Sequence, residues 1–538
     1  MRTERGRIRV TLEPCARRPE FAVRAVSDAA RLCRRIEAKP RFFNALAFAL
    51  AILAALASAW VADRVYERIP HLEDEMANLW QAEVMAEGQV YQPSPPMPRS
   101  FLVPFVVDYE GHRFGKYPPG WPAVLSLGAR AGAPWLVNPI LAGLTAWLVY
   151  RLGSRIAGRG VGLLAEALTA ASPIFLMLSG SLMGHSLGLF LTTAFWLAWL
   201  DLFPVVGKPQ PDGVPAWLLV SVAGSCLGLL ALTRPLTAVG IGLPGALHGL
   251  ILLVRGDWQV RRRVLCVGGL ALLVAAILPL WQWSLTGDPW LNPYTLWWPY
   301  DRVGFGLGAG HTASGHNLHW AYINARFSLR AGVHDLFGWP YLSWLFLPFG
   351  LIALRRSRDS WLLFSIFPSL VFVYLFYWIG SWLLGPRYYY EALPGLAITS
   401  AAGVAWLGGW LGSRGRRWAA PRRVTVATAF LVLVALNLLY YVPIRVGGLH
   451  GLYGISRMVM GPFEAADLGQ ALVIVHPVDS WTEYGTLLTL TPPFADSGLL
   501  LAYSRGPEAD ARLARLFTER PVYHYYADQP ETFYPRPR

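Results

Sequence analysis

The sequence predicts an all-α polytopic membrane protein with about 11 transmembrane helices, a long first outer loop carrying amphipathic surface helices, and a small C-terminal α/β appendage. Hydrophobic residues make up 54% of the 538 residues and charged residues only 15%, whereas a soluble domain carries about 25% charged residues. The apolar residues lie in long runs, and about 20 in a row span a bilayer. Arginines gather between alternate runs, as the positive-inside rule requires.

The positive charge is distributed as in a membrane protein. The formal net charge is +14, but it falls in short patches between apolar runs, so we expect no nucleic-acid partner. The four cysteines show neither metal-ligand spacing nor a disulfide framework; they are Cys15, Cys33, Cys226 and Cys266.

The chain divides into a basic N-terminal arm (1–42), a membrane-spanning part (43–443) and a C-terminal segment (444–538). Residues 1–42 are Arg-rich and are expected to form a cytoplasmic arm, partly disordered or lying on anionic lipid. The first span covers about 43–62, and the polar loop 63–119 follows with nine acids against five bases. Residues 120–131 are predicted to be re-entrant. Further spans are expected at 134–150, 160–179, 185–203, 216–233, 235–254, 264–285, 337–354, 360–380, 389–411 and 424–443.

The breaks between these spans set the orientation. Alternate breaks, beginning with 151–159, are basic, and the basic residues are Arg151, Arg155 and Arg159; Lys208; Arg255 and Arg261–Arg263; Arg355, Arg356 and Arg358; and Arg414, Arg416, Arg417, Arg422 and Arg423. These loops are therefore assigned to the cytoplasm of a bacterial inner membrane. The odd number of crossings places residues 444–538 outside, where strands at 471–477, 499–504 and 521–526 and a helix at 508–517 are expected.

The stretch HLEDEMANLWQAEVMAEGQVY (71–91) is predicted to form a helix from about Glu73, because apolar residues recur at three- and four-residue spacing. Such a helix would lie on the membrane surface. Its three consecutive acids, Glu73, Asp74 and Glu75, are more than capping requires, although Glu73 suits that role. The surplus acids favour proton abstraction or metal binding.

Other unusual residues share the outer side. Lys116 in HRFGKYPPGWP (112–122) either snorkels at the interface or contacts a phosphate, with Tyr117 beside it. His185 begins a span, and a lone histidine there is more often a satisfied polar residue than a ligand. Arg234 lies in an almost uncharged stretch, so it needs an anionic partner, either a protein carboxylate such as Asp74 or a ligand phosphate.

The long loop 286–336 contains GHTASGHNLHW (310–320), with His311, His316 and His319. Their spacing could hold a metal on a helix, but Gly310 and Gly315 favour a loop that hydrogen-bonds sugar hydroxyls or lipid headgroups. In SWLLGPRYYYEALP (381–394), Arg387 and Tyr388 lie at a span boundary where positive charge is otherwise scarce. Arginine suits bidentate phosphate recognition.

The ordered set of motifs resembles the GT-C superfamily of polytopic glycosyltransferases, most closely the bacterial relatives of protein O-mannosyltransferases and aminoarabinose transferases. The resemblance covers about 43–443 and rests on Asp74-Glu75 followed by QAEVMAEGQVY, YPPGWP (117–122), Ser172-Pro173, Arg234-Pro235 and GPRYYYEALP (385–394).

The resemblance implies an inverting transfer of a sugar from a polyprenyl-phosphate-linked donor to a lipid, glycan or protein acceptor outside the cytoplasm. Asp74 would be the general base, and Glu75 would orient it or help hold a divalent metal where one is used. Arg234, Arg387 and, more weakly, Lys116 would neutralise the donor phosphate. Tyr117, His185, His316 and Tyr388 are expected to contact substrate. His185 departs from the acid that many relatives carry near that turn.

Two other functions fit the same chain. A transporter or flippase of a lipid-linked sugar would place ionisable residues at mid-span, lining a pathway. Here the charged candidates cluster outside, and Glu166 and Asp201 are the few acids within or at the ends of spans. The other alternative is a membrane subunit with a degenerate site, which the presence of Asp74, Arg234 and Arg387 disfavours.

Overall fold

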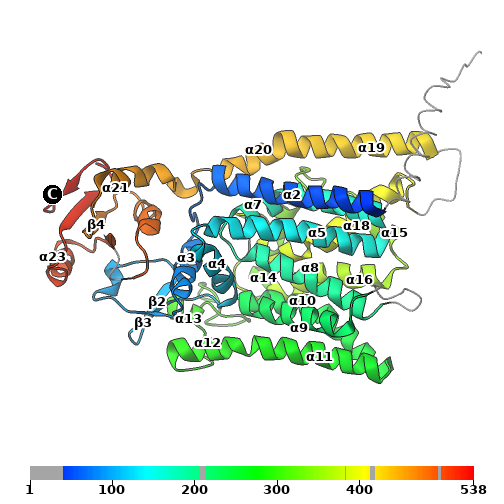
Figure 1. Ribbon diagram of the computed structural model, residues 1–538, viewed down its shortest axis with the longest axis horizontal. Helices are drawn as coiled ribbons and strands as arrows, with labels where there is room; N and C mark the ends of the chain where they lie inside the picture. Colours follow the sequence, from blue (N-terminus) through cyan, green and yellow to red (C-terminus); the bar gives the residue numbers. More distant parts are fainter. Residues whose placement is uncertain (1–39, 205–212, 382, 412–418, 495–497) are drawn as a thin grey trace, which may run out of the picture.

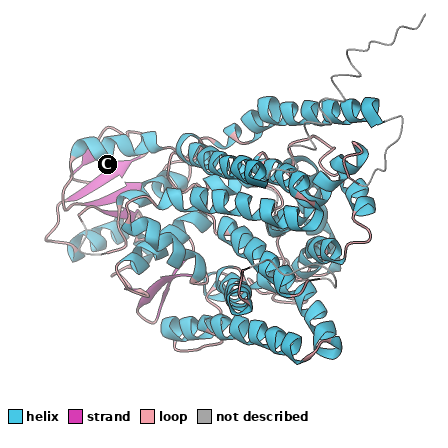
Figure 2. Ribbon diagram, turned by 45° about the vertical axis from the view of Figure 1, so that its right-hand side comes forward, coloured by secondary structure: helices cyan, strands magenta, loops and turns pink. Residues whose placement is uncertain are grey.

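A computed structural model describes residues 40–204, 213–381, 383–411, 419–494 and 498–538. Residues 1–39 of the predicted cytoplasmic arm, and the predicted inner residues Lys208, Arg414, Arg416 and Arg417, lie outside the described residues. The described residues form a bundle of helices that run side by side, with strands confined to one end (Figures 1 and 2). The predicted helical membrane fold with a small sheet region is confirmed.

The first half of the chain forms α2 (Pro40–Arg64), α3 (Glu73–Ala86), β1 (Gln92–Pro93), β2 (Val106–Tyr109), β3 (His112–Gly115), α4 (Gly120–Arg130), α5 (Val137–Ala157), α6 (Arg159–Ala170), α7 (Pro173–Gly180), α8 (His185–Leu202), α9 (Ala216–Thr233), α10 (Pro235–Arg255), α11 (Trp258–Ala275) and α12 (Ile277–Thr286). The second half forms α13 (Tyr294–Trp297), α14 (Leu318–Asp335), α15 (Leu347–Ala353), α16 (Arg358–Phe364), α17 (Ile366–Tyr374), the 3-10 helix η3 (Arg387–Ala392), α18 (Leu393–Leu407), α19 (Ala419–Leu436), α20 (Val442–Arg445), α21 (Gly461–Ala466), β4 (Leu472–His476), α22 (Thr482–Gly485), β5 (Leu500–Tyr503), α23 (Pro507–Leu516), β6 (Val522–Tyr526) and β7 (Phe533–Tyr534).

Among the described residues, six helical segments are long and apolar enough to cross a membrane, or seven if one bent pair counts as a span, so the chain is a multi-pass membrane protein. The predicted number of about 11 is not confirmed. The predicted span 160–179 is α6 and α7, which meet at 58° where Pro173 cannot continue the helix. The predicted spans within 337–411 consist of short helices, of which the longest, α18, has 15 residues.

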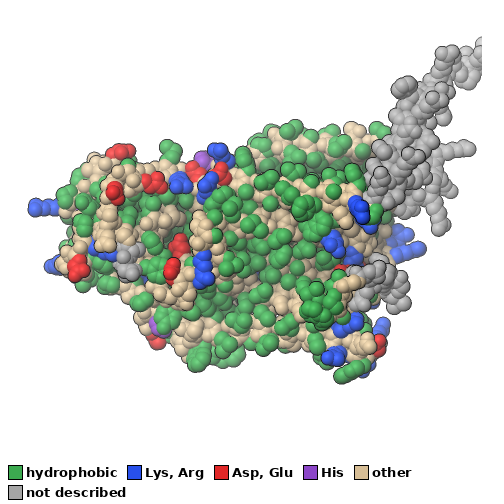
Figure 3. Space-filling model, viewed as in Figure 1, with side chains coloured by type: hydrophobic (Ala, Val, Ile, Leu, Met, Phe, Trp, Pro, Cys, Tyr) green, Lys and Arg blue, Asp and Glu red, His purple; other side chains and the backbone are tan. Residues whose placement is uncertain are grey.

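The helices differ in how much of their surface is buried within the protein. A single apolar core joins α2, α5 to α10 and α15 to α18. In the apolar 18-residue stretches of the segments Trp258–Thr286 and Pro421–Ala466, only 17% and 6% is buried within the protein, and the two segments lie at opposite edges of the bundle (Figure 1). Their apolar side chains therefore face lipid. Green hydrophobic side chains cover the middle of the molecule, and charged side chains gather towards its two ends (Figure 3).

The loop 63–119, called the first loop below, is folded at the same end of the bundle as the C-terminal segment (Figure 1). It contains α3 and a three-stranded sheet of order β1-β3-β2. Strands β2 and β3 pair in antiparallel register, Val106 opposite Gly115. The hairpin turns at Glu110 and Gly111, both with positive φ, as a two-residue turn requires. This hairpin sets the position of Lys116 and Tyr117, which follow β3 directly.

The C-terminal segment is a small α/β unit, as predicted. Its sheet has the order β5-β4-β6-β7, with β4 parallel to both β5 and β6 and β7 antiparallel to β6. The predicted strands correspond to β4, β5 and β6, and the predicted helix to α23. The loop 286–336 is more regular than expected, because Asn317 accepts hydrogen bonds from the amides of His319 and Trp320 and so caps the 18-residue helix α14.

Candidate active site

Helix α3 begins one residue before Asp74, and Glu75 fixes that start. The Glu75 carboxylate accepts hydrogen bonds from the amides of His71 (2.7 Å) and Leu72 (3.0 Å), and its other oxygen accepts one from the amide of Leu182 (2.7 Å). Glu75 is 1% exposed, and burial raises the pKa of its carboxyl to about 7, although the three amide hydrogen bonds act in the opposite direction. The N-terminal cap is therefore made by Glu75 and not by Glu73, because the third residue of the helix can reach back to the cap amide.

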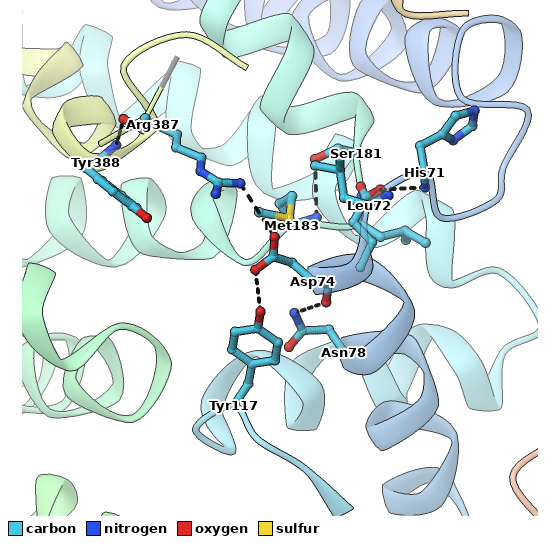
Figure 4. Close-up of polar contacts among 12 residues, drawn as sticks. His71, Leu72, Asp74, Asn78, Tyr117, Ser181, Met183, Arg387 and Tyr388 are labelled. Carbon is cyan, nitrogen blue, oxygen red and sulfur yellow. Dashed lines mark hydrogen bonds and ion pairs between the residues drawn. The ribbon is translucent and has the colours of Figure 1, made fainter. Parts of the chain in front are cut away.

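The Asp74 carboxylate points the other way, into a cavity. Its Oδ1 accepts a hydrogen bond from the Tyr117 hydroxyl, and its Oδ2 lies 3.7 Å from Arg387 Nη1. Figure 4 shows Asp74 between these two side chains, with Tyr388 beside the arginine. Burial raises the pKa of Tyr117 well above its ordinary value, so the hydroxyl is neutral and donates. Burial disfavours the charged Arg387, but the Asp74 carboxylate and the neighbouring Tyr388 and Tyr117 together outweigh it and raise the pKa of Arg387.

The cavity that Asp74 faces, called the α3 cavity below, has a volume of about 380 Å³. It is formed by α3, the residues after β3, the start of α8, the α9–α10 junction, the loop after α12, the end of α17 and the start of η3. Its polar and charged lining residues include Glu73, Asp74, Asn78, Lys116, Tyr117, His185, Thr233, Arg234, Asn292, Tyr294, Asp301, Tyr374, Tyr377, Arg387 and Tyr388. The structure thus brings together Asp74, all three predicted phosphate-binding residues, and Tyr117, His185 and Tyr388.

Arg234 lies at the junction of α9 and α10 and has a carboxylate partner that the sequence interpretation missed. Its Nη1 lies 2.7 Å from Glu391 Oε1, and its Nη2 donates to the Tyr374 hydroxyl at 3.2 Å. Glu391 is fully buried. Its position within GPRYYYEALP, four residues after Arg387, was the only signal in the sequence. Because Nη1 also lies 3.5 Å from the backbone carbonyl of Arg387, the two arginines are neighbours.

Lys116 is 3% exposed and lies in an aromatic cage. Its Nζ lies 3.7 Å from the centre of the Phe105 ring and 4.5 Å from that of Trp298. Asp301, also missed, pairs with Nζ at 3.5 Å and accepts hydrogen bonds from Tyr377 and Trp378. Burial lowers the pKa of Lys116 despite the nearby Asp301. The long loop 286–336 therefore contributes an acid to the cavity.

The predicted histidines fall in different places. His185 is 5% exposed, lines the α3 cavity, and neither ring nitrogen has a hydrogen-bond partner among the described residues. His316 lies outside the cavity, where its Nε2 is 2.9 Å from the Leu375 carbonyl and its ring stacks on Phe305. His311 packs against Trp378, and His319 is the second residue of α14.

A divalent metal would need a cluster of donors. Within the described ranges, no group of three or more His, Cys, Asp or Glu side chains could hold a metal ion. Glu75 has its oxygens on backbone amides, and His311, His316 and His319 do not converge. The residues present therefore do not form the metal site that the sequence allowed.

The similarity of this chain to known proteins lies in its three-dimensional fold. No family model matches the chain. No curated protein matches it either. ArnT from Cupriavidus metallidurans bound to undecaprenyl phosphate superposes with a TM-score of 0.53 at 15% identity over 89% of each chain.

The chain has the GT-C fold. The apo structure of the same ArnT gives a TM-score of 0.53 at 14% identity, again over 89% of each chain. AglB, an oligosaccharyltransferase from Archaeoglobus fulgidus in complex with an inhibitory peptide and a dolichol-phosphate, gives 0.47 at 15% identity over 83% of this chain and 63% of its own. In this chain α3, α4 and the hairpin of the first loop lie together at one end of the bundle (Figure 1).

Proposed function

We propose that this chain is a membrane glycosyltransferase that moves a sugar from a polyprenyl-phosphate-linked donor to an acceptor hydroxyl, with inversion at the anomeric carbon. One observation carries the proposal: the Asp74 carboxylate and the guanidinium groups of Arg387 and Arg234 face one cavity at the end of an apolar bundle. A base beside two cations suits a reaction in which a hydroxyl loses a proton and a phosphate leaves. The solved ArnT with undecaprenyl phosphate bound supports the class of donor.

The reaction is a single displacement. The acceptor hydroxyl enters the α3 cavity and transfers its proton to Asp74, while its oxygen forms a bond to the anomeric carbon. The bond from that carbon to the phosphate oxygen breaks, and its electron pair leaves with the polyprenyl phosphate. Attack from the face opposite the phosphate inverts the configuration.

The three cations are not equivalent. Arg387 is the primary ligand of the departing phosphate, since its carboxylate contact among the described residues, with Asp74, is long at 3.7 Å. Arg234 is already paired with Glu391 at 2.7 Å, and it adds a second positive charge next to Arg387. Lys116 is neutralised by Asp301 and shielded by aromatic rings, so it ranks third. Charges fixed in place before the reaction stabilise a leaving anion without reorganisation.

The other residues position the base and the substrates. Tyr117 holds one oxygen of Asp74, and Glu75 fixes the helix turn that carries it. His185 and Tyr388 line the cavity and are proposed substrate contacts. The acceptor is a lipid, glycan or protein hydroxyl.

The proposed site of action is the outer face of a bacterial inner membrane. The arginine-rich breaks lie at the end of the bundle opposite the first loop and the C-terminal segment, where blue side chains gather in Figure 3. By the positive-inside rule that end is cytoplasmic. The α3 cavity and residues 444–538 then lie outside, and the N-terminus lies inside.

The first test is Asp74→Asn in the purified protein with a polyprenyl-phosphate sugar. The asparagine oxygen can still accept from Tyr117, so the fold is kept, and loss of general-base catalysis lowers turnover about 100- to 10,000-fold. Glu87→Gln, at the exposed end of the same helix, is the matched control and keeps full rate. Sugar transfer by Asp74→Asn at the wild-type rate would overturn the mechanism.

The same preparation separates the alternatives. A flippase moves lipid-linked sugar across sealed vesicles without forming a glycosidic bond, whereas the proposed enzyme releases polyprenyl phosphate in step with glycosylated product. A degenerate subunit does neither.

A further inference from the structure

A second cavity, of about 480 Å³, lies at the arginine-rich end of the bundle between α10 and the α16–α17 segment. We call it the α10 groove. Its wall is apolar and includes Leu247, Ile251 and Leu362, while Arg255, Arg358 and His248 supply its basic groups. No residue of the groove belongs to the α3 cavity, so the proposed transferase reaction does not account for it.

The groove opens towards the lipid. Leu247 and Ile251 are 57% and 53% exposed on α10, a helix apolar and long enough to span a membrane. Arg255 is the last residue of that helix, eight residues beyond Leu247, which corresponds to roughly 12 Å along the axis. The groove therefore runs from headgroup depth, where the arginines lie, into the region of the acyl chains.

The basic end of the groove has more hydrogen-bond donors than acceptors. His248 is 5% exposed, and its Nδ1 accepts from Trp199 Nε1 at 3.1 Å, while its Nε2 faces the Arg358 guanidinium. A neutral imidazole has only one acceptor nitrogen. Whichever tautomer is present, one ring N–H points at another donor.

Two carboxylates at this end of the bundle pair with Arg155. Asp359, next to Arg358 in the chain, lies 2.6 Å from Arg155 Nη1, and Asp201 lies on the same arginine. Neither acid lines the groove. An anionic oxygen beside His248 and Arg358, on the groove side of their contact, would give their N–H groups an acceptor.

We propose that the α10 groove binds a phospholipid with an anionic headgroup, whose phosphate contacts Arg255, Arg358 and His248 and whose acyl chain lies along Leu247 and Ile251. Basic pockets between spans at this membrane depth suit such headgroups. A free phosphate would leave the exposed apolar wall uncovered, and this is why the occupant is a lipid.

A lipid in this position bridges two elements that also reach the α3 cavity. Helix α10 packs on α17, where the Ser369 hydroxyl donates to the Gly240 carbonyl at 2.6 Å. At the opposite end of the same pair, Arg234 before α10 donates to Tyr374 at the end of α17. The bound lipid therefore stabilises the α10–α17 pair.

The experiment uses the full chain in nanodiscs of phosphatidylcholine, with or without phosphatidylglycerol, and reads lipid retention by native mass spectrometry together with the melting temperature. Phosphatidylglycerol is expected to be retained and to raise the melting temperature. The double variant Arg255→Gln/Arg358→Gln weakens retention about fivefold for each arginine, roughly 30-fold in all.

Two controls make the outcome specific. Arg262→Gln/Arg356→Gln removes the same charge from exposed positions at the same end, outside the groove, and keeps retention. Leu247→Trp fills the exposed groove without a change of charge and also loses the lipid, which covers the case in which the arginine variant fails to fold. Equal behaviour in both lipids, equal loss in the two double variants, or an equal shift with inorganic phosphate in detergent overturns the proposal.

Discussion

At the residue scale, each cation of the α3 cavity has its own acid, but the three pairs differ in exposure. Glu391 and Asp301 have side chains 0% and 2% exposed, whereas the Asp74 side chain is 28% exposed. Asp74 is therefore the acid that an incoming hydroxyl can reach. The sequence was sufficient to predict Asp74, Arg234 and Arg387 as neighbours, but Asp301 and Glu391 were missed because such pairing is set by tertiary packing.

The buried environment of His185 does not stabilise the folded protein. A buried polar group without a hydrogen bond costs about 1–3 kcal/mol, and His185 lines the cavity with two buried ring nitrogens that have no hydrogen-bond partner among the described residues. His185→Leu is therefore expected to leave the melting temperature unchanged or raise it. The donor KM rises about tenfold, because a hydrogen bond to the donor phosphate is lost.

His316→Leu is the matched comparison, since His316 is also buried but contacts the Leu375 carbonyl outside the cavity. This variant is expected to lower the melting temperature and to leave the donor KM unchanged. The role of His185 as a donor contact is wrong if His185→Leu melts at a lower temperature with an unchanged KM.

At the element scale, local sequence patterns predicted individual helices and strands correctly, but they did not predict where the apolar spans are broken. The start of α3, the strands β4 to β6 and α23 followed from local pattern. The number of spans did not, because a hydropathy window counts apolar residues and does not detect the 58° bend before Pro173 or the division of 360–380 into α16 and α17. Such breaks are stabilised by contacts from neighbouring helices.

The start of α3 also predicts a pH dependence. Burial raises the pKa of Glu75 from 4.5 to about 7 in the folded protein. The folded state therefore binds this proton more tightly than the unfolded chain, so its contribution to stability is complete below about pH 4.5 and is lost as the pH rises through 7. The change is of the order of 3 kcal/mol, taking about 1.4 kcal/mol for each pKa unit.

Glu75→Gln is expected to flatten the fall in melting temperature between pH 5 and 8, measured in detergent. Its amide group also faces the donors of His71 and Leu72, so the variant melts at a lower temperature at pH 5. Glu87→Gln, on the exposed end of α3, keeps the wild-type slope. A slope unchanged in Glu75→Gln would show that another group titrates in this window.

At the scale of the whole molecule, the C-terminal segment and the first loop are one structure. Ile69 and Met76 share an apolar cluster with Ile455, Met460 and Phe463, and the Arg457 amide donates to Glu67 at 2.9 Å. The sequence predicted the α/β unit correctly but not its contact with the first loop, since nothing local reports such a contact. Helix α3 therefore carries Asp74 towards the cavity and Met76 towards the C-terminal segment.

If the chain catalyses the proposed transfer, this arrangement makes the reaction depend on a segment that contributes no described residue to the cavity. Phe463→Ala removes a buried side chain from the shared cluster and destabilises it by about 3–5 kcal/mol. Hydrogen exchange of the amides in 69–86 is expected to accelerate, and turnover to fall, because Asp74 is no longer held against Arg387. Leu516→Ala, at a side chain 55% exposed on α23, changes neither. If Phe463→Ala loosens only the C-terminal amides and leaves 69–86 protected, the segment is an independent appendage and the position of Asp74 is determined by Glu75 and the bundle alone.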